Sequence, residues 1–181
     1  MSESDAPGDL GMVQRLVNTL DVETGDDGLA APDGVARFAD ANGVELPGVT
    51  ASQLVELREG LRAALLRHAG AEPPADGLAV LTRMLRDAPL VVRLGADGRA
   101  ALAAAPGVHG VGAVTARVAA AIAVGEVTGE WRRLKACHAT DCAWAYYDRS
   151  PAGRRRWCSM SVCGSRAKMR SYRDRQRATE E

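Results

Sequence analysis

The sequence has few aromatic residues, almost no lysine and no long hydrophobic run. Aromatic residues make up 4% of the 181 residues, and only two of the 23 basic residues are lysines. Because there is no run of 18 apolar residues, we expect no membrane-spanning helix. The first 30 residues carry seven acidic groups and no apolar stretch, so we expect no secretory signal peptide. These absences predict a cytoplasmic protein whose thiols stay reduced.

The zero formal net charge conceals two segments of opposite charge. Residues 1–130 contain 10 basic and 18 acidic residues, whereas residues 131–181 contain 13 basic and 5 acidic residues. All four cysteines and six of the seven aromatic residues also lie in the second segment. Such asymmetry indicates a polyanion as one partner. We therefore predict two domains, 1–130 and 131–181.

The first segment is predicted to be mainly helical, with one small β-hairpin. Apolar residues recur at helical spacing in 10–20, 33–42, 50–70, 76–89 and 114–125. Thr50 and Gln53 form a capping box at the start of the clearest helix. On that helix, Arg58 and Arg62 are expected on a solvated face, and His68 is interpreted as a surface or capping histidine. The hairpin is expected at 90–102 around Asp97-Gly98.

The four cysteines form two pairs with equal spacing. Cys137 and Cys142 are separated by four residues, as are Cys158 and Cys163. Two closely spaced pairs can supply the four tetrahedral ligands of one structural Zn²⁺. The alternatives are that the cysteines are ordinary small apolar residues or that His138 replaces one thiolate.

Between the cysteine pairs, the sequence predicts a hairpin. Trp144 to Tyr147 form its first strand, Ser150 to Gly153 its turn, and Arg154 to Trp157 its return strand. A helix follows from about Ser161 to Arg177. A turn that carries the first cysteine pair, the hairpin and the helix together predict a treble-clef-like zinc finger, so the predicted fold class is α+β. An apolar face of the helix is expected to pack on the hairpin through Val162, Met169 and Tyr172.

The same segment carries the candidate nucleic-acid contacts. Arg166, Arg170, Arg173 and Arg177 share one helical face. Basic residues interleaved with aromatic ones around a zinc fold are typical of nucleic-acid binding. The alternatives are that these basic residues form a solvated face, or that they bind an acidic protein surface such as the chain's own acidic segment. The candidate contacts are Arg154, Arg155, Arg156, Arg166, Lys168, Arg170, Arg173, Arg175 and Arg177.

The cysteine-containing segment resembles the CGNR zinc-finger family. The matching pieces are Arg155–Met160, Cys163–Lys168, Cys137–Cys142 and Tyr147–Ser150. One departure is Ser165, which stands where that family has the asparagine of its name. The resemblance implies a finger that binds DNA in a bacterial transcription regulator.

The first segment resembles the helical ABATE domain, which usually precedes this finger. The matching pieces are Leu16–Asp21 and Leu54–Leu66. This resemblance implies that the helical domain senses a ligand or mediates dimerisation in a stress-induced regulator.

We therefore predict a transcriptional regulator that binds double-stranded DNA, contains one structural Zn²⁺ and associates with the nucleoid. No membrane partner is expected. A homodimer and an unidentified small-molecule effector or protein partner are further hypotheses. The alternative function is a zinc-containing protein-interaction adaptor with an autoinhibitory acidic segment. We expect no enzyme, because a four-cysteine shell leaves no open metal position and the deaminase motif is missing.

Overall fold

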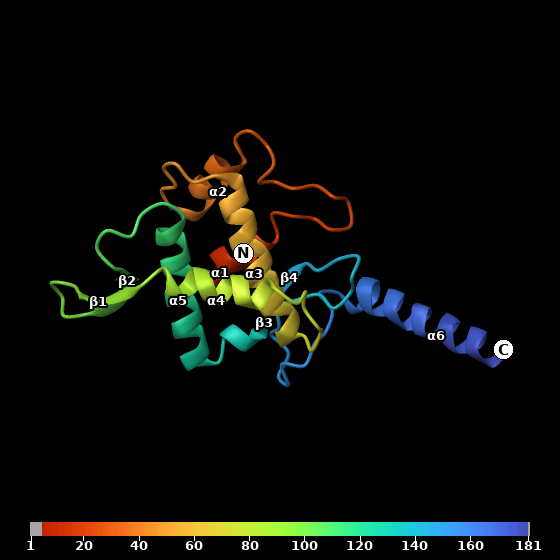
Figure 1. Ribbon diagram of the computed structural model, residues 1–181. Coiled ribbons are helices and arrows are strands. Elements are labelled where there is room, and N and C mark those ends of the chain that lie inside the picture. The colour runs from red at the N-terminus through yellow and green to blue at the C-terminus, as the bar shows by residue number, and fades with distance from the viewer. Residues whose placement is uncertain (1–4, 181) are drawn as a thin grey trace.

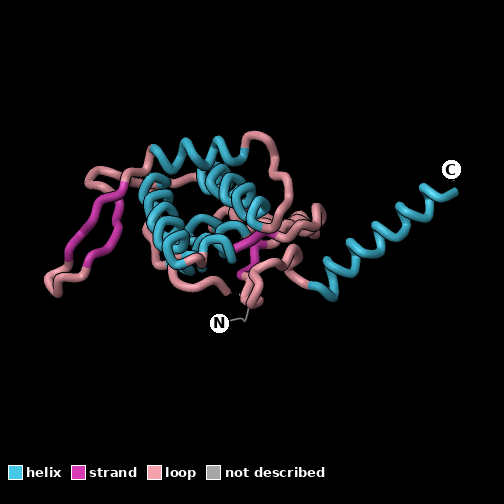
Figure 2. Tube along the Cα trace, turned by 90° about the horizontal axis from the view of Figure 1, so that it is seen from below, coloured by secondary structure: helices cyan, strands magenta, loops and turns pink. Residues whose placement is uncertain are grey.

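The structure is a computed structural model that describes residues 5–180, with side chains for 5–173 and 175–177. A helical body carries a long β-hairpin on one side and a long helix on the other (Figures 1 and 2). The elements in chain order are α1 Leu10–Val17, α2 Gly34–Asn42, α3 Ala51–His68, α4 Gly77–Arg86, β1 Leu90–Leu94, β2 Ala100–Ala104, α5 Val111–Thr128, a 3₁₀ turn Trp131–Arg133, β3 Leu134–Ala136, β4 Ala145–Tyr147, a π turn Met160–Gly164 and α6 Ser165–Glu180. The expected fold class is confirmed.

Helix α3 is the centre of the hydrophobic core. Its apolar stripe, Leu54, Leu57, Leu61 and Leu65, is completely buried. The capping box holds its first turn: the Thr50 hydroxyl accepts from the Gln53 backbone amide, and the Gln53 side chain accepts from the Thr50 amide. The predicted helix therefore begins where expected. Around it pack α1, α4, α5 and β3, which cover most of the middle of α3 but leave Glu56 and Glu59 exposed.

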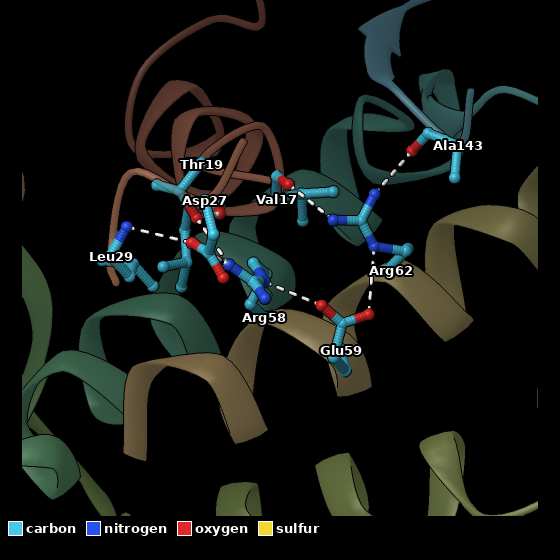
Figure 3. A network of polar contacts seen from close by, with 9 residues as sticks. Val17, Thr19, Asp27, Leu29, Arg58, Glu59, Arg62 and Ala143 are labelled. Atoms are coloured by element: carbon cyan, nitrogen blue, oxygen red, sulfur yellow. Dashed lines mark hydrogen bonds and ion pairs between the residues drawn. The ribbon is translucent and has the colours of Figure 1, made fainter. Parts of the chain in front are cut away.

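The expectation that Arg58 and Arg62 lie on a solvated face is wrong. Their relative exposures are 3% and 6%. Both guanidinium groups form ion pairs with Glu59, and Arg58 also pairs with Asp27 (Figure 3). Burying a charged group is tolerable only when it is paired and hydrogen-bonded. The amphipathic pattern could not reveal these partners, because Asp27 belongs to a loop far along the chain.

Two predicted elements differ in detail from the structure. The hairpin β1–β2 is present, and its alanine-rich strand β2 is fully paired with β1 in antiparallel register from Leu90–Ala104 to Leu94–Ala100. Helix α5 is longer than predicted. Among the described helices, it is also the one long and apolar enough, by length and composition alone, to cross a membrane. Its buried residues Val114 and Val118 belong to the same core as α3, as in a core helix of a globular protein.

The hydrophobic core continues past residue 130. Trp131, Leu134, Ala136, Ala145 and Tyr147 belong to the same buried cluster as α1 and α3. Strands β3 and β4 therefore complete the helical body, although they flank the first cysteine pair. The predicted boundary between 1–130 and 131–181 remains a prediction, and the packing across it is continuous.

The hairpin predicted between the two cysteine pairs is wrong in its pairing. Strand β4 pairs with β3, upstream of Cys137, in the register Leu134–Tyr147 to Ala136–Ala145. Residues 154–157 form no strand. Their backbone runs beside the first cysteine pair instead (residues 137–142, called the knuckle below). There the His138 amide donates to the Arg156 carbonyl at 2.9 Å. The segment 154–157 is nearer to β4 in the sequence, but β3 contributes the buried apolar residues Leu134 and Ala136, whereas Arg154 and Arg156 are exposed.

Candidate metal centre and nucleic-acid interface

The sulfur atoms of the four cysteines form one compact cluster. All four Sγ atoms of Cys137, Cys142, Cys158 and Cys163 lie within 4.8 Å of one another. The Sγ atom of Cys158 lies 3.7 Å from the Sγ atoms of both Cys142 and Cys163. Regular tetrahedral zinc with Zn–S bonds of about 2.3 Å has S···S edges of about 3.8 Å. A disulfide would require sulfurs at about 2.05 Å. The donors therefore fit one tetrahedral Zn²⁺.

Local backbone geometry brings each cysteine pair together. The first pair is a knuckle at the end of β3–β4, closed by the Cys137 amide donating to the Trp144 carbonyl at 2.9 Å. Ala143 turns the chain with a positive φ of 49°. In the second pair, Cys163 lies on the π turn that leads into α6, and Cys158 lies two residues before that turn. The Ser159 hydroxyl accepts from the Val162 amide and so caps this turn.

Electrostatics favour a cation among the four thiols. Hydrogen bonds from Cys142 and Cys158 lower the pKa of Cys137 to about 2. The bond to Cys137 in turn raises the pKa of Cys142 to about 12, and burial raises the pKa of Cys163. Ionisation of the Cys137 thiol therefore makes ionisation of the neighbouring thiols less favourable. A divalent ion removes this conflict by stabilising all four thiolates. The cluster holds one structural Zn²⁺ and leaves no open coordination position.

A buried ion pair supports the polypeptide around the zinc site. The Lys135 ammonium lies 2.9 Å from the Asp148 carboxylate and also donates to the carbonyls of Gly153 and Arg155. Asp148 accepts in addition from the Arg155 backbone amide and from Ser150. Burial alone would raise the pKa of Asp148, but the bonds from Ser150 and Lys135 outweigh it and lower the pKa to about 2. The pair thereby fixes the segment between the two cysteine pairs.

Three side chains of the helical body attach directly to the knuckle. The Asn18 amide binds both backbone groups of Ala145, donating to its carbonyl at 2.9 Å and accepting from its amide at 2.7 Å. Gln14 donates to the same carbonyl. Arg62 donates to the carbonyls of Val17 at 2.9 Å and Ala143 at 2.8 Å (Figure 3). The zinc site is thus built on α1 and α3 as well as on its own segment.

The three arginines before Cys158 have different roles. Arg154 is exposed. Arg155 is half-buried, and its guanidinium donates to the Cys158 carbonyl at 2.7 Å and lies over the Tyr146 ring. Arg156 is exposed and lies 5.5 Å from the Trp157 ring centroid, within hydrogen-bond distance of His138. His138 therefore orients an arginine, and it is not among the clustered ligand atoms.

The six candidate contacts on the last helix are all exposed. Arg166 and Arg170 nevertheless bind carboxylates of the same molecule: Arg166 lies 2.8 Å from Glu23, and Arg170 lies 3.4 Å from Asp141. The remaining candidates on α6 are Lys168, Arg173, Arg175 and Arg177. Helix α6 points away from the helical body (Figure 1). It presents its cationic side chains along most of its length.

The expectation that the apolar side of this helix packs on a hairpin is wrong. Val162, Met169 and Tyr172 are 45%, 57% and 50% exposed. The predicted hairpin is not present, and β3–β4 already packs in the main core. These apolar side chains consequently lie on the surface beside the arginines.

A hollow of about 620 Å³ lies between the knuckle and α6. Arg156 and His138 line it on the knuckle side, and Lys168 and Arg170 line it on the helix side. Trp157 also contributes an aromatic surface. The structure thus brings together three of the nine predicted contacts, Arg156, Lys168 and Arg170, around one concave surface. Such a surface fits an anionic group near an aromatic ring.

The sequence analysis did not identify the residues that support the zinc site and attach it to the helical body. Lys135 and Asp148 support the inter-cysteine segment, and Asn18 and Arg62 attach the knuckle to the helices. Two signals were present: Asn18 lies in the Leu16–Asp21 piece, and Asp148 in the Tyr147–Ser150 piece. Both pieces carried the family resemblance, but their contacts needed the tertiary structure.

Comparison with known proteins agrees with this geometry. Residues 11–130 match the ABATE family model, which is described as "Putative stress-induced transcription regulator". Residues 133–176 match the CGNR zinc finger. No curated protein matches the chain significantly. Since the first model covers well over half of the chain, the protein belongs to the ABATE family and carries a CGNR zinc finger after that domain.

Proposed function

We propose that the protein binds double-stranded DNA through the cationic surface formed by α6 and the knuckle. The observation that carries the proposal is the exposed cationic side of α6, which begins two residues after the zinc ligand Cys163 and projects from the body. Its 16 residues give a length of about 24 Å. The major groove, about 12 Å wide, admits a helix of this kind.

In this proposal the side chains divide between anchoring and structural roles. Lys168, Arg173 and Arg177 contact phosphates along α6, and Arg156 and Arg170 hold a phosphate in the hollow beside Trp157. Arg155 has a different role from the one predicted for it. Its guanidinium is engaged with the Cys158 carbonyl, so we assign it to positioning the second cysteine pair.

A salt titration tests the electrostatic contact. Binding of the zinc-loaded protein to a 30-base-pair duplex is measured by fluorescence anisotropy between about 50 and 200 mM salt. We expect affinity to fall linearly on a logarithmic plot. Arg173→Ala should make the slope less negative by about one unit, because one phosphate contact is lost.

The matched control is Arg37→Ala, which removes an exposed arginine from α2. It should leave the slope unchanged. Equal slopes for the wild type and Arg173→Ala would exclude α6 as the contact. Selection from random duplexes with excess competitor then asks whether the protein also reads sequence: an enriched motif makes it a sequence-specific regulator, and binding without one makes the finger an electrostatic anchor.

The second candidate function is a protein-interaction adaptor held closed by the acidic segment. The contact between Glu23 and Arg166 favours it, because it joins the acidic loop before α2 to the first turn of α6. The exposed apolar residues Met169 and Tyr172 on the same helix, and Val162 on the π turn before it, also suit a protein surface. The small-molecule effector remains a hypothesis.

A further inference from the structure

Helix α6 carries a stripe of uncharged side chains between two rows of cationic ones. An α-helix turns once in 3.6 residues, so residues three, four and seven apart share a face. The uncharged stripe, with spacings of four, three and four, consists of Ser165, Met169, Tyr172 and Gln176. The row on one side of it consists of Arg166, Arg170, Arg173 and Arg177, and the row on the other side consists of Lys168 and Arg175.

The stripe is exposed although it contains two large apolar side chains. Met169 and Tyr172 are 57% and 50% exposed, and Gln176 donates to the Tyr172 hydroxyl at 2.6 Å along the helix. Helix α6 points away from the helical body, and in the described part of the chain it packs mainly against the π turn before it (Figure 1). No core therefore covers the stripe. A partner that covers it removes apolar surface from water, which stabilises the complex.

A second hollow, of about 530 Å³, lies on this side of α6. Met169 and Val162 of the π turn form its apolar part, and the Ser165 hydroxyl lies beside them. None of its lining residues is acidic, and the cations that border it are Arg166, Arg170 and Arg173. The hollow therefore suits an apolar group that belongs to an anionic molecule.

The cations of both rows are only partly neutralised within the chain. Arg166 pairs with Glu23, and Arg170 pairs with Asp141. Among the described side chains, no carboxylate pairs with Arg173 or with Lys168, so each row keeps at least one available cation. The partner should therefore carry anionic groups in two rows with an apolar group between them. Double-stranded DNA has this arrangement, because phosphates border the major groove on both sides and the thymine methyl group lies on its floor.

We infer that α6 recognises thymine through Met169, an inference that rests on the proposed binding of DNA by this helix. A helix with its side chains is about 10–12 Å across, and the major groove is about 12 Å wide. The two cationic rows then face the two phosphate backbones, and the stripe faces the base edges. Met169, in the middle of the stripe, covers the methyl group of thymine. Of the four bases, only thymine presents a methyl group in this groove.

Two 30-base-pair duplexes test the assignment. One is of alternating adenine and thymine, and the other has uracil in place of every thymine, so it lacks only the methyl groups. Binding of the full-length, zinc-loaded protein to each is measured by fluorescence anisotropy at about 100 mM salt. We expect the thymine duplex to bind about three- to five-fold more tightly, which is the effect of burying one methyl group.

Three variants assign this preference to one side chain. Met169→Ser should bind both duplexes equally, with the salt dependence of the wild type, because no phosphate contact is lost. Met169→Leu should keep the preference, since leucine is also apolar. Met160→Ser is the matched control: Met160 is 60% exposed but lies on the π turn outside the stripe, so this variant should keep the preference too.

The outcomes separate this inference from the proposed function. Equal affinities of the wild type for the two duplexes would overturn the role of Met169 and leave DNA binding intact. A thymine preference that survives in Met169→Ser would also overturn it, because the preference would then come from the shape of the duplex. Failure to bind either duplex would overturn both proposals and favour a protein partner for α6.

Discussion

Single buried polar residues connect the helical body to the zinc finger. Arg62 is the clearest case, because one guanidinium joins α3 to the end of α1 and to the knuckle (Figure 3). Its hydrogen bond to Ala143 lies at the residue that turns the chain with a positive φ. Asn18 acts similarly by occupying the free edge of β4. The finger therefore depends on the helices for its geometry.

Replacing Arg62 by methionine should destabilise the protein by about 2–4 kcal/mol. The methionine fills a similar volume but leaves the buried carbonyls of Val17 and Ala143 without their donor. Urea unfolding measures the loss, and zinc release to a chelator should be faster. Arg67→Met is the matched control: Arg67 pairs with Glu72 on the surface, so this change should cost less than about 1 kcal/mol. Similar losses in both variants would contradict the role of Arg62.

His68 should make stability depend on pH near neutrality. Its Nδ1 lies 2.8 Å from the Leu134 carbonyl, and its ring packs edge-on against Trp131. Burial lowers the pKa of His68 below 6.5, and the bond to Leu134 only partly opposes this. A histidine with a lowered folded pKa contributes its full stability above the unfolded pKa. That contribution is lost as the pH falls below about 6.5, because the unfolded chain then binds the proton first.

Unfolding free energies measured from pH 7.5 to 5.5 should therefore fall more steeply for the wild type than for His68→Gln. Glutamine can still donate to the Leu134 carbonyl but does not titrate. Parallel curves for the two proteins would show that His68 is not the responsible group.

At the level of elements, the sequence predicts what is local. The capping box and leucine spacing predict α3, the turn Asp97-Gly98 predicts β1–β2, and the paired cysteines predict the metal site. The partner of β4 was not predictable from local signals, since Leu134–Ala136 is only three residues long and lies between a 3₁₀ turn and the first cysteine pair. Nor was the burial of Arg58, because its partner Asp27 is 31 residues away. Element identity was therefore encoded locally, and contacts between distant elements were not.

The zinc ion should determine whether α6 is helical. The helix begins two residues after Cys163, and all of its described side chains except that of Ala167 are exposed, so it gains little from tertiary packing. Isolated helices of this length are marginal in water. Chelation of the zinc should release protection from hydrogen exchange first in residues 158–177, while α3 stays protected. Loss of protection in α3 as early as in α6 would show instead that zinc stabilises the whole fold as one unit.

At the scale of the whole molecule, opposite charges are separated in sequence but only partly in space. The acidic loop touches the basic helix through Glu23 and Arg166, and Asp141 of the knuckle touches Arg170. The outer part of α6 extends beyond these contacts (Figure 1). The acidic segment thus meets the base of the helix and leaves most of its length uncovered. If α6 binds DNA as proposed, this geometry favours tuning of the affinity over full autoinhibition.

Glu23→Gln distinguishes these two roles in the intact chain. Deleting residues 1–130 would not, because β3 and β4 share the core of α1 and α3 and need it to fold. If Glu23 only competes with one phosphate for Arg166, the substitution should tighten DNA binding by about two- to five-fold, as expected for an exposed ion pair. Asp26→Gln is the matched control: it removes an acidic group from the same loop without touching α6.

A gain of a hundredfold would mean that the loop covers the whole helix and that the adaptor hypothesis, with its release by a signal, is correct. No gain, or an equal gain from Asp26→Gln, would mean that the contact with Arg166 has no effect on binding and that any influence of the loop is its overall charge.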